Sequence, residues 1–326
     1  MDLFSHALFP YLLGNYFKKR KEEITAFVIG GIAPDIDIFL LLIQYLYPTF
    51  FLITHRGITH SLFFGFFTGI IVLYVASRNS VKKIVQKHID FEPVFSRRNI
   101  VFAFAGIIVH LVLDYSTTRG VPLFYPFDVT RYSAELFFYT DIYITIASLI
   151  MVIFLLRRTF RTPNITKLLI IFLILLAGMG ALRFTEKNNT EQYFHDGTIK
   201  TFPTMNPFEW YAQKEEGKKI DIYQYNGWEG KSNYNNTFKR LNVISGGMDL
   251  EKALVHADEL PQLKMFKWRA HSVAVNASYG NGTWVLEYYD PVQRAEMRDI
   301  SGTFRIASAR FSSITINVMG DRAIAN

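Results

Sequence analysis

The stretch Gly30-Gly31-Ile32-Ala33-Pro34-Asp35-Ile36-Asp37 places two carboxylates inside the apolar run Ile24–Leu46, which is long enough to cross a bilayer. An ionisable side chain inside a membrane span costs about 2.5–3.5 kcal/mol on insertion scales, so it is a functional candidate by default. In a regular helix, Asp35 and Asp37 would point apart. Pro34 and the paired glycines predict a local break, which would let both carboxylates face one cavity.

Other apolar stretches predict that the chain crosses the membrane several times. A span needs about 20 apolar residues. Besides Ile24–Leu46, the candidates are Ile58–Ala76, Ile100–Leu113 (extended to Ser116), Leu136–Leu156 and the shorter Leu168–Leu182. Leu3–Phe17 is a further apolar helix that would span only a thin bilayer. We therefore expect residues 1–183 to form a transmembrane bundle of five to six helices.

Basic residues alternate between the connecting loops. Segments 18–23, 78–98 and 157–167 together carry fourteen Lys and Arg, whereas segments 47–57 and 117–135 carry three. Cytoplasmic loops hold the excess of positive charge. The three basic segments are therefore predicted to be cytoplasmic, and the N-terminus and the part that follows the spans are predicted to lie outside.

Residues 184–326 read as a small soluble domain rich in β-strands. Runs that alternate between apolar and polar residues are separated by turn sequences such as Tyr279-Gly280-Asn281-Gly282. The strands expected from this alternation are Asp221–Tyr225, Ser272–Ala277, Thr283–Tyr289, Thr303–Ala307 and Ser312–Val318. The fold class is thus mainly α, a membrane bundle followed by an extracytoplasmic β-rich domain. No catalytic constellation is evident in this domain.

The composition narrows the chemistry. The chain contains no cysteine, which excludes thiolate metal sites and thiol nucleophiles. Its net charge of +7 fits the basic loops of a membrane protein, and no basic stripe is interleaved with aromatic residues. We therefore expect membrane lipid, and no nucleic acid, as a partner.

Several polar side chains are predicted to lie at one depth in the bilayer. His6, Asp35 and His110 are eleven or twelve residues from the cytoplasmic ends of their segments, which corresponds to about 17 Å. Asp114 follows His110 by four residues and shares its helix face, as His6 does with Asp2. The remaining candidates flank the outer ends of spans: His55, His60 and, more weakly, Asp141.

Imidazole and carboxylate ligands together suit Zn2+, with Mn2+ or Fe2+ as alternatives. Such a metal activates water without Ser or Cys, and Arg56 is placed to hold a phosphate of the substrate. Two other interpretations stay open. The polar residues could form a structural network between helices, with an outer domain that binds a partner. They could also line an ion or proton pathway.

These residues also carry a family resemblance. The chain resembles the YdjM-type inner-membrane proteins, which are described as metal-dependent hydrolases and as LexA-binding. The matching pieces are Ser5-His6, Ala33-Pro34-Asp35-Ile36-Asp37, His55-Arg56-Gly57-Ile58-Thr59-His60-Ser61, His110-Leu111-Val112-Leu113-Asp114, Gly120 with Tyr125-Pro126-Phe127, and Asp141. The resemblance covers about residues 1–183, and its most specific piece is the segment from His55 to Ser61.

The resemblance implies distant similarity to zinc-dependent phospholipases C and single-strand nucleases, which cleave phosphoesters. The metal ligands that it implies are His6, Asp35, Asp37, His55, His60, His110 and Asp114. We expect an inner-membrane, metal-dependent hydrolase of a phosphoester or lipid-linked substrate. In it Asp35 or Asp37 would hold metal or take a proton. Nothing in the sequence suggests a repressor such as LexA as a partner.

Overall fold

The computed structural model describes most of the 326 residues. The residues outside the description are 41–42, 44–45, 47–53, 88, 158–163, 196–198, 300–311 and 326. The chain divides into two compact units. The first contains residues 1–43 and 53–184, and the second contains residues 44–52 and 185–326.

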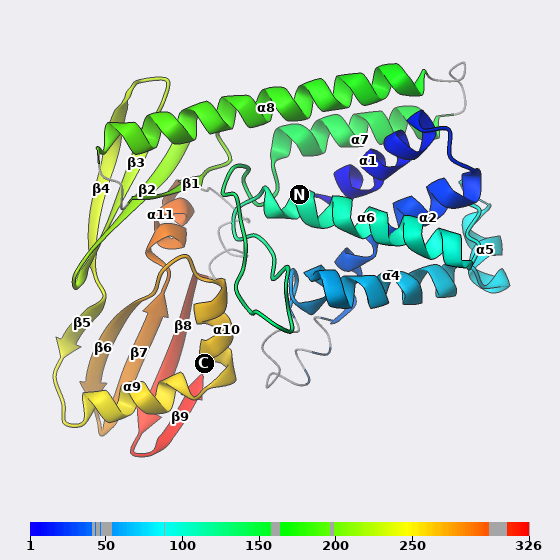
Figure 1. Ribbon diagram of the computed structural model, residues 1–326. Helices are drawn as coiled ribbons and strands as arrows, with labels where there is room; N and C mark the ends of the chain where they lie inside the picture. Colours follow the sequence, from blue (N-terminus) through cyan, green and yellow to red (C-terminus); the bar gives the residue numbers. More distant parts are fainter. Residues whose placement is uncertain are drawn as a thin grey trace. The chain divides into compact units, whose positions relative to one another are not determined.

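The first unit is helical (Figure 1). Its elements are α1 (Leu3–Tyr16), α2 (Lys21–Ile32), the 3₁₀ helices η1 (Pro34–Phe39) and η2 (Ile58–His60), α4 (Leu62–Ala76), α5 (Asn79–Val85), α6 (Arg97–Tyr115), α7 (Ile142–Leu156) and α8 (Ile165–Tyr193), the last of which continues into the second unit. Four of these helices begin after a residue whose polar side chain caps the first turn. The side chains of Asp2, Ser61, Ser96 and Asp141 accept hydrogen bonds from backbone N–H groups in the first turns of α1, α4, α6 and α7.

Glycines let α2 and α6 pack with their backbones nearly touching. A Cβ on Gly30 would overlap the carbonyl oxygen of Ala103, and a Cβ on Gly106 would overlap that of Phe27. Small residues allow this close approach between membrane helices, where van der Waals packing and hydrogen bonds drive association. The contact brings the end of α2 against the half of α6 that carries His110.

The spans differ in part from those expected. Among the described residues, two helices, α6 and α8, are long and apolar enough to cross a membrane, and the pair α4 and α5, bent by 80°, would make a third. The prediction that Ile24–Leu46 is interrupted is confirmed, because α2 ends at Ile32 and Pro34 starts η1. The continuous span is therefore absent from its described part.

The boundaries predicted for three helices were wrong. The helix expected from Ile58 begins at Leu62, because Ile58–His60 forms the separate turn η2. The helix expected from Leu136 begins at Ile142, where Asp141 caps it. The short fifth span lies within the much longer α8.

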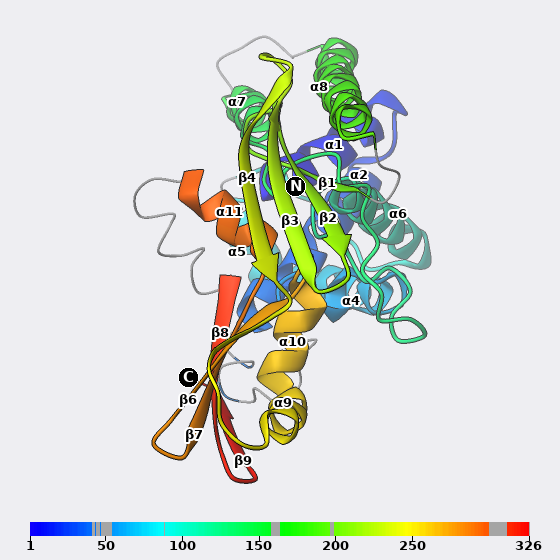
Figure 2. The same cartoon turned by 90° about the vertical axis from the view of Figure 1, so that its left-hand side faces the viewer.

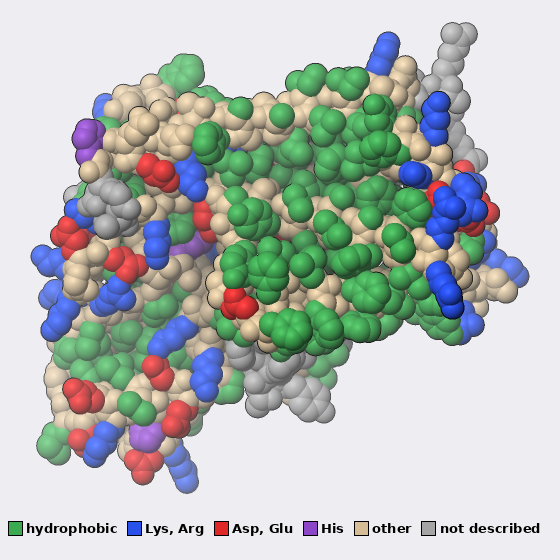
Figure 3. All heavy atoms as spheres, viewed as in Figure 1, with side chains coloured by type: hydrophobic (Ala, Val, Ile, Leu, Met, Phe, Trp, Pro, Cys, Tyr) green, Lys and Arg blue, Asp and Glu red, His purple; other side chains and the backbone are tan. Residues whose placement is uncertain are grey.

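Charged and apolar side chains separate along the helical unit. The α1–α2 connection, α5 and the start of α6 lie at one end of it (Figure 1). Lys and Arg side chains gather at that end, and hydrophobic side chains cover the face of the helices beside it (Figure 3). The basic segments 18–23 and 78–98 thus lie on one side of the apolar band, as a membrane topology requires.

The second unit contains two sheets, so the β-rich prediction is confirmed. The first sheet is an antiparallel meander of β1 (Lys200–Pro203), β2 (Glu209–Glu216), β3 (Lys219–Asn226) and β4 (Lys231–Lys239). The second has the order β5 (Leu241–Ser245), β6 (Ala274–Gly280), β7 (Thr283–Tyr289), β8 (Ser313–Met319) and β9 (Arg322–Ala325), in which β5 and β6 are parallel and the other neighbouring strands are antiparallel.

Three helices complete this unit: α9 (Leu250–Asp258), α10 (Pro261–Arg269) and α11 (Pro291–Asp299). Apolar side chains of α9 and α10 pack on the second sheet, and both helices lie beside its strands in Figure 2. Val292 and Ala295 of α11 share a core with residues of both sheets. This core joins the two sheets.

The expected strands are found where the description allows a comparison. Thr283–Tyr289 is β7 as predicted, and Asp221–Tyr225 lies within β3. Asn281 and Gly282, both with positive φ, form the predicted two-residue turn between β6 and β7. The other two predicted strands overlap β6 and β8 with shifted ends, and Thr303–Ala307 lies outside the described residues.

We expect Gly106→Ala to destabilise the helical unit. Overpacking a close contact costs about 1–3 kcal/mol, which exceeds the roughly 0.5–1 kcal/mol that Ala gains over Gly inside a helix. Thermal unfolding in detergent would measure the loss. Gly178→Ala in α8 is the matched control, since an added Cβ there meets nothing within 4 Å. A Gly106→Ala protein as stable as the Gly178→Ala protein would contradict the close α2–α6 contact.

Candidate metal centre

The structure brings together the seven residues predicted as metal ligands. They form three groups whose candidate ligand atoms lie within 4.8 Å of one another: His6, His110 and Asp114; Asp35, His60 and His110; and Asp37, His55 and His60. The groups are linked, because His110 belongs to the first two and His60 to the last two. Residues from α1, η1, η2, α6 and the turn before η2 thus converge on one place.

The break after α2 gives both acidic residues of η1 access to the same imidazole. Asp35 Oδ1 lies 3.5 Å from Nε2 of His60, and Asp37 Oδ2 lies 3.1 Å from its Nδ1. Because η1 is a 3₁₀ helix that begins at Pro34, the backbone turns away from the axis of α2 at this point. The two carboxylates therefore lie next to different nitrogens of the His60 ring.

Asp114 divides its two carboxylate oxygens between two kinds of partner. Oδ1 accepts a hydrogen bond of 2.8 Å from Nη2 of Arg56 and forms an ion pair with the amino group of Met1. Oδ2 faces the Nε2 atoms of His60 and His110, each at 3.4 Å. The side chain of Asp114 is 1% exposed. Oδ1 thus compensates buried positive charge, and Oδ2 remains available to bind a cation.

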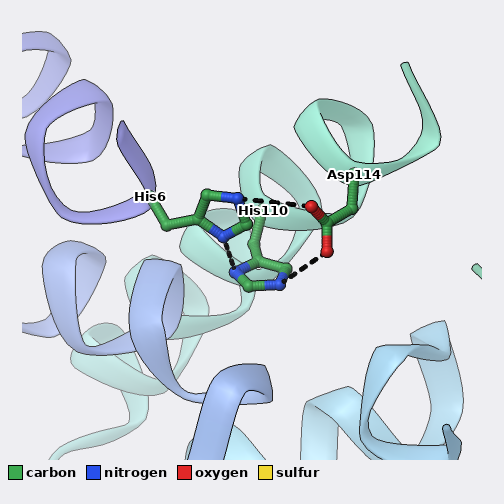
Figure 4. Close-up of side chains that lie close together, drawn as sticks. All are labelled: His6, His110 and Asp114. Carbon is green, nitrogen blue, oxygen red and sulfur yellow. Dashed lines mark hydrogen bonds and ion pairs between the residues drawn. The ribbon is translucent and has the colours of Figure 1, made fainter. Parts of the chain in front are cut away.

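Four buried atoms at the centre have no hydrogen-bond partner among the described residues. They are Nε2 of His6, His60 and His110, and Oδ2 of Asp114. Buried polar atoms are rarely left unpaired, so such a set calls for an explanation. Figure 4 shows two of these imidazoles facing the Asp114 carboxylate, and His6 Nε2 lies 3.4 Å from Asp114 Oδ1.

The separations between these atoms fit a shared cation. Two ligand atoms about 2.0–2.1 Å from one tetrahedral zinc ion lie roughly 3.3 Å apart. Nε2 of His60 lies 3.4 Å from Asp114 Oδ2 and 3.5 Å from Asp35 Oδ1, and Nε2 of His110 lies 3.4 and 3.8 Å from the same oxygens. Two imidazoles and two carboxylates therefore surround one point at the spacing of metal ligands.

Hydrogen bonds on the far side of the rings orient them toward that point. Nδ1 of His110 lies 2.7 Å from the carbonyl oxygen of Gly31, to which it donates when protonated. Nδ1 of His60 lies 3.1 Å from Asp37 Oδ2. A proton held on Nδ1 leaves Nε2 free to bind a metal, which is the usual arrangement around metal-ligating histidines.

Asp37 is held by hydrogen bonds from the segment between Arg56 and Thr59 as well as by histidines. Its Oδ2 accepts hydrogen bonds from the backbone N–H of Arg56 and from the Thr59 hydroxyl, and its Oδ1 lies 2.8 Å from Nδ1 of His55. These contacts suit a carboxylate that orients histidines, a role compatible with the predicted ones as ligand or base. Asp35 is more open, with a side chain 13% exposed.

Arg56 lies inside the protein. Its side chain is 1% exposed, and its Nη atoms donate to Thr117, Asp114 and the carbonyl oxygen of Tyr139. Its guanidinium also lies 4.0 Å from the centre of the Tyr139 ring. These contacts place it to orient Asp114, and its predicted hold on a substrate phosphate stays a prediction.

Sequence reasoning missed Thr117 and Tyr139. Thr117 follows Asp114 by three residues, so helical spacing was a usable signal for it. Tyr139 had no such signal, because it precedes α7 and meets Arg56 only through the tertiary fold.

Asp141, the weakest candidate, lies apart from the cluster. It caps α7, and its Oδ2 lies 2.7 Å from Nη2 of Arg183 in an ion pair whose two side chains are fully buried. The pair joins the start of α7 to α8. Asp141 therefore has a structural role in this arrangement.

A model of the YdjM inner membrane protein family matches residues 1–186. The chain belongs to this family. The YdjM match covers the whole helical unit and includes every residue of the cluster, so the resemblance seen in the sequence is confirmed. No curated protein and no solved structure matches the chain.

We expect Asp141→Asn to lower the stability of the protein without changing its metal content. Asn still caps a helix, but it removes the negative charge from the buried pair with Arg183, and breaking a buried ion pair costs about 3–5 kcal/mol. Chemical denaturation in detergent would measure the loss.

The double variant Asp141→Asn with Arg183→Met is the control, since removing both charges should restore most of the stability. If Asp141→Asn lost metal while remaining as stable as the wild-type protein, the structural role of Asp141 would be wrong.

Proposed function

We propose that this YdjM-family protein is a membrane-embedded, metal-dependent hydrolase that cleaves a phosphoester. The observation that carries the proposal is the set of unpartnered, buried Nε2 and carboxylate atoms at ligand spacing. In the membrane, unpaired polar groups of this kind are costly, and a bound cation offsets that cost. The proposed ligands are His6, Asp35, Asp37, His55, His60, His110 and Asp114.

The donor set favours Zn2+. The groups contain only imidazole nitrogen and carboxylate oxygen, and the chain offers no thiolate. Zinc takes both donor types in tetrahedral sites, while Mn2+ and Fe2+ are the alternatives that tolerate them. His60, His110, Asp35 and Asp114 are drawn from the first two groups, and the N···O separations between their ligand atoms are 3.4–3.8 Å. They form the proposed position for one ion.

A bound divalent cation would polarise a phosphoryl oxygen and acidify a water molecule. Asp35, the most exposed carboxylate of the cluster, is the proposed proton acceptor. Asp37 keeps His60 and His55 oriented. Arg56 holds Asp114 in place through its 2.8 Å hydrogen bond.

An apolar groove supports a lipid as the source of the phosphoester. Its volume is about 570 Å³, within the range of ligand sites. It is lined by Leu62, Phe63, Phe66, Phe67, Phe104, Leu123, Phe124, Tyr125 and Phe127. The groove starts at Leu62, two residues after His60, although no member of the cluster lines it. An acyl chain there would leave its headgroup near the start of α4.

We further propose a topology with two domains. Residues 1–183 form the membrane domain in the inner membrane, with the basic loops in the cytoplasm. Residues 184–326 form an extracytoplasmic β-rich domain. This orientation places the loops that carry His55 and Arg119 on the outer side.

Purified protein should contain zinc or manganese, and His60→Ala should lower the metal affinity by more than about 100-fold, because even an orienting partner is worth 10–100-fold. Asp37→Ala should lower it as well. Elemental analysis and competition with a chelator provide the measurement. His256→Ala in the second unit is the matched control, since that histidine pairs with Asp321 and belongs to none of the three ligand groups found among the described residues. Full metal content in both cluster variants would rule out the proposed centre.

The metal-loaded protein should hydrolyse a long-chain phosphoester in detergent micelles more efficiently than its short-chain analogue. Each buried CH2 contributes about 0.8 kcal/mol, so losing two of them would lower kcat/KM roughly tenfold. Product release from a panel of lipid and soluble phosphoesters tests this.

If the metal-loaded protein turned over no member of the panel, the structural interpretation of the polar cluster would be favoured instead. Proton flux through the protein in reconstituted vesicles would favour an ion pathway.

A further inference from the structure

The ring of Tyr139 is a platform shared by one histidine of the cluster and two arginines. The His55 ring lies 6.2 Å from the Tyr139 ring, centre to centre. The guanidinium carbon of Arg56 lies 4.0 Å from the centre of the Tyr139 ring, and that of Arg119 lies 5.8 Å from it. Arg119 therefore lies beside the cluster, although no sequence pattern selects it.

The two arginines differ in what their guanidinium groups contact. Arg56 is buried, and its Nη atoms already donate to Thr117, Asp114 and Tyr139. Arg119 is partly exposed. Within the part of the chain that the structure describes, its guanidinium has no hydrogen bond or ion pair, and it lies over the Tyr139 ring. Arg119 thus keeps its hydrogen-bond donors for a ligand.

The backbone around Arg119 is held in a defined conformation. Arg119 has φ +68° and Gly120 has φ +48°, a left-handed pair that residues with side chains adopt rarely. Arg131 donates hydrogen bonds to the carbonyl oxygens of both residues, at 2.7 and 2.8 Å. The backbone N–H of Arg119 donates to Oε1 of Glu135 at 3.2 Å. These contacts fix where the Arg119 side chain leaves the loop.

The most accessible side of the cluster faces the same platform. The side chain of His55 is 28% exposed, which is the largest value in the cluster and exceeds that of Asp35. His55 is also the cluster residue that contacts Tyr139. A ligand that reaches the proposed metal ions past His55 therefore passes close to Arg119.

We propose that Arg119 binds the phosphate of the substrate at the edge of the metal centre, while Arg56 serves to position Asp114. This inference rests on the proposed phosphoester hydrolysis and assigns the recognition of its substrate. A guanidinium offers paired N–H donors that match two phosphate oxygens, and a ring beneath it restricts its orientation. The ligand class is a phosphate monoester or diester, carried by a lipid or free in solution.

The test is the binding of dodecyl phosphate and of inorganic phosphate to the full-length protein in dodecyl maltoside micelles. Isothermal titration calorimetry would be run with the metal present and again after chelation. Arg119→Gln should weaken the binding of at least one probe about tenfold, the loss expected for one charge-assisted contact. Arg119→Lys keeps the positive charge but loses the paired N–H donors of the guanidinium. Its affinity for the probes should therefore lie between those of Arg119→Gln and the wild-type protein.

Arg78→Gln is the matched control, because Arg78 also lies over a tyrosine ring, that of Tyr74 at 4.2 Å. It should bind both probes like the wild-type protein. Weakened binding of dodecyl phosphate alone by Arg119→Gln would assign the site to an amphiphile, and weakened binding of both probes would assign it to phosphate from either source.

Metal content and thermal stability, measured on the same samples, separate this inference from the proposed function. Arg119 acts on the ligand, so Arg119→Gln should keep both at wild-type values. If the purified wild-type protein contained no metal but still bound phosphate through Arg119, the proposed hydrolase would be overturned and the phosphate-binding role of Arg119 would stand. The inference is overturned if Arg119→Gln or Arg119→Lys binds both probes as tightly as the wild-type protein, or if the wild-type protein binds neither.

Discussion

The negative charge of a carboxylate buried in a membrane helix must be compensated, and the structure of the helical unit depends on how this is done for Asp114. It is 1% exposed and lies on α6, a helix long and apolar enough to cross the bilayer. Its Oδ1 is neutralised by Arg56 and the Met1 amino group, while Oδ2 faces His60 and His110. The N-terminus, the turn before η2 and α6 are all held in place by this one group.

The rest of the helical unit provides the space for that arrangement. Gly30 and Gly106 allow α2 and α6 to pack backbone to backbone, which brings the Gly31 carbonyl within 2.7 Å of His110. Pro34 then ends α2 and redirects the chain into η1, so that Asp35 and Asp37 reach the same imidazole. Close packing and a helix break together produce a polar cluster within an apolar bundle.

The two arginines near this cluster illustrate how burial determines the role of a charged residue. Arg56 is fully enclosed, and its contacts with Asp114 and Thr117 make it part of the scaffold. Arg119 is partly exposed and lies beside the same tyrosine. Its guanidinium N–H groups make no hydrogen bond to the residues that the structure describes. A guanidinium in the first setting stabilises a buried anion, whereas one in the second is suited to binding an anion that arrives from outside.

Much of this protein was determined locally by the sequence. Apolar runs predicted a membrane-embedded helical part, alternation predicted the β-rich part, and misplaced His and Asp residues marked a polar cluster, because each of these patterns follows from the cost of exposing or burying one side chain. The broken span was also predictable, since Pro34 acts on its own helix. The tertiary structure alone decided the length of α8, the helix starts at Leu62 and Ile142, and the separate role of Asp141. It also decided which buried atoms lack partners and which arginine faces outward. Such properties depend on distances between residues far apart in the chain, and no local periodicity encodes those distances.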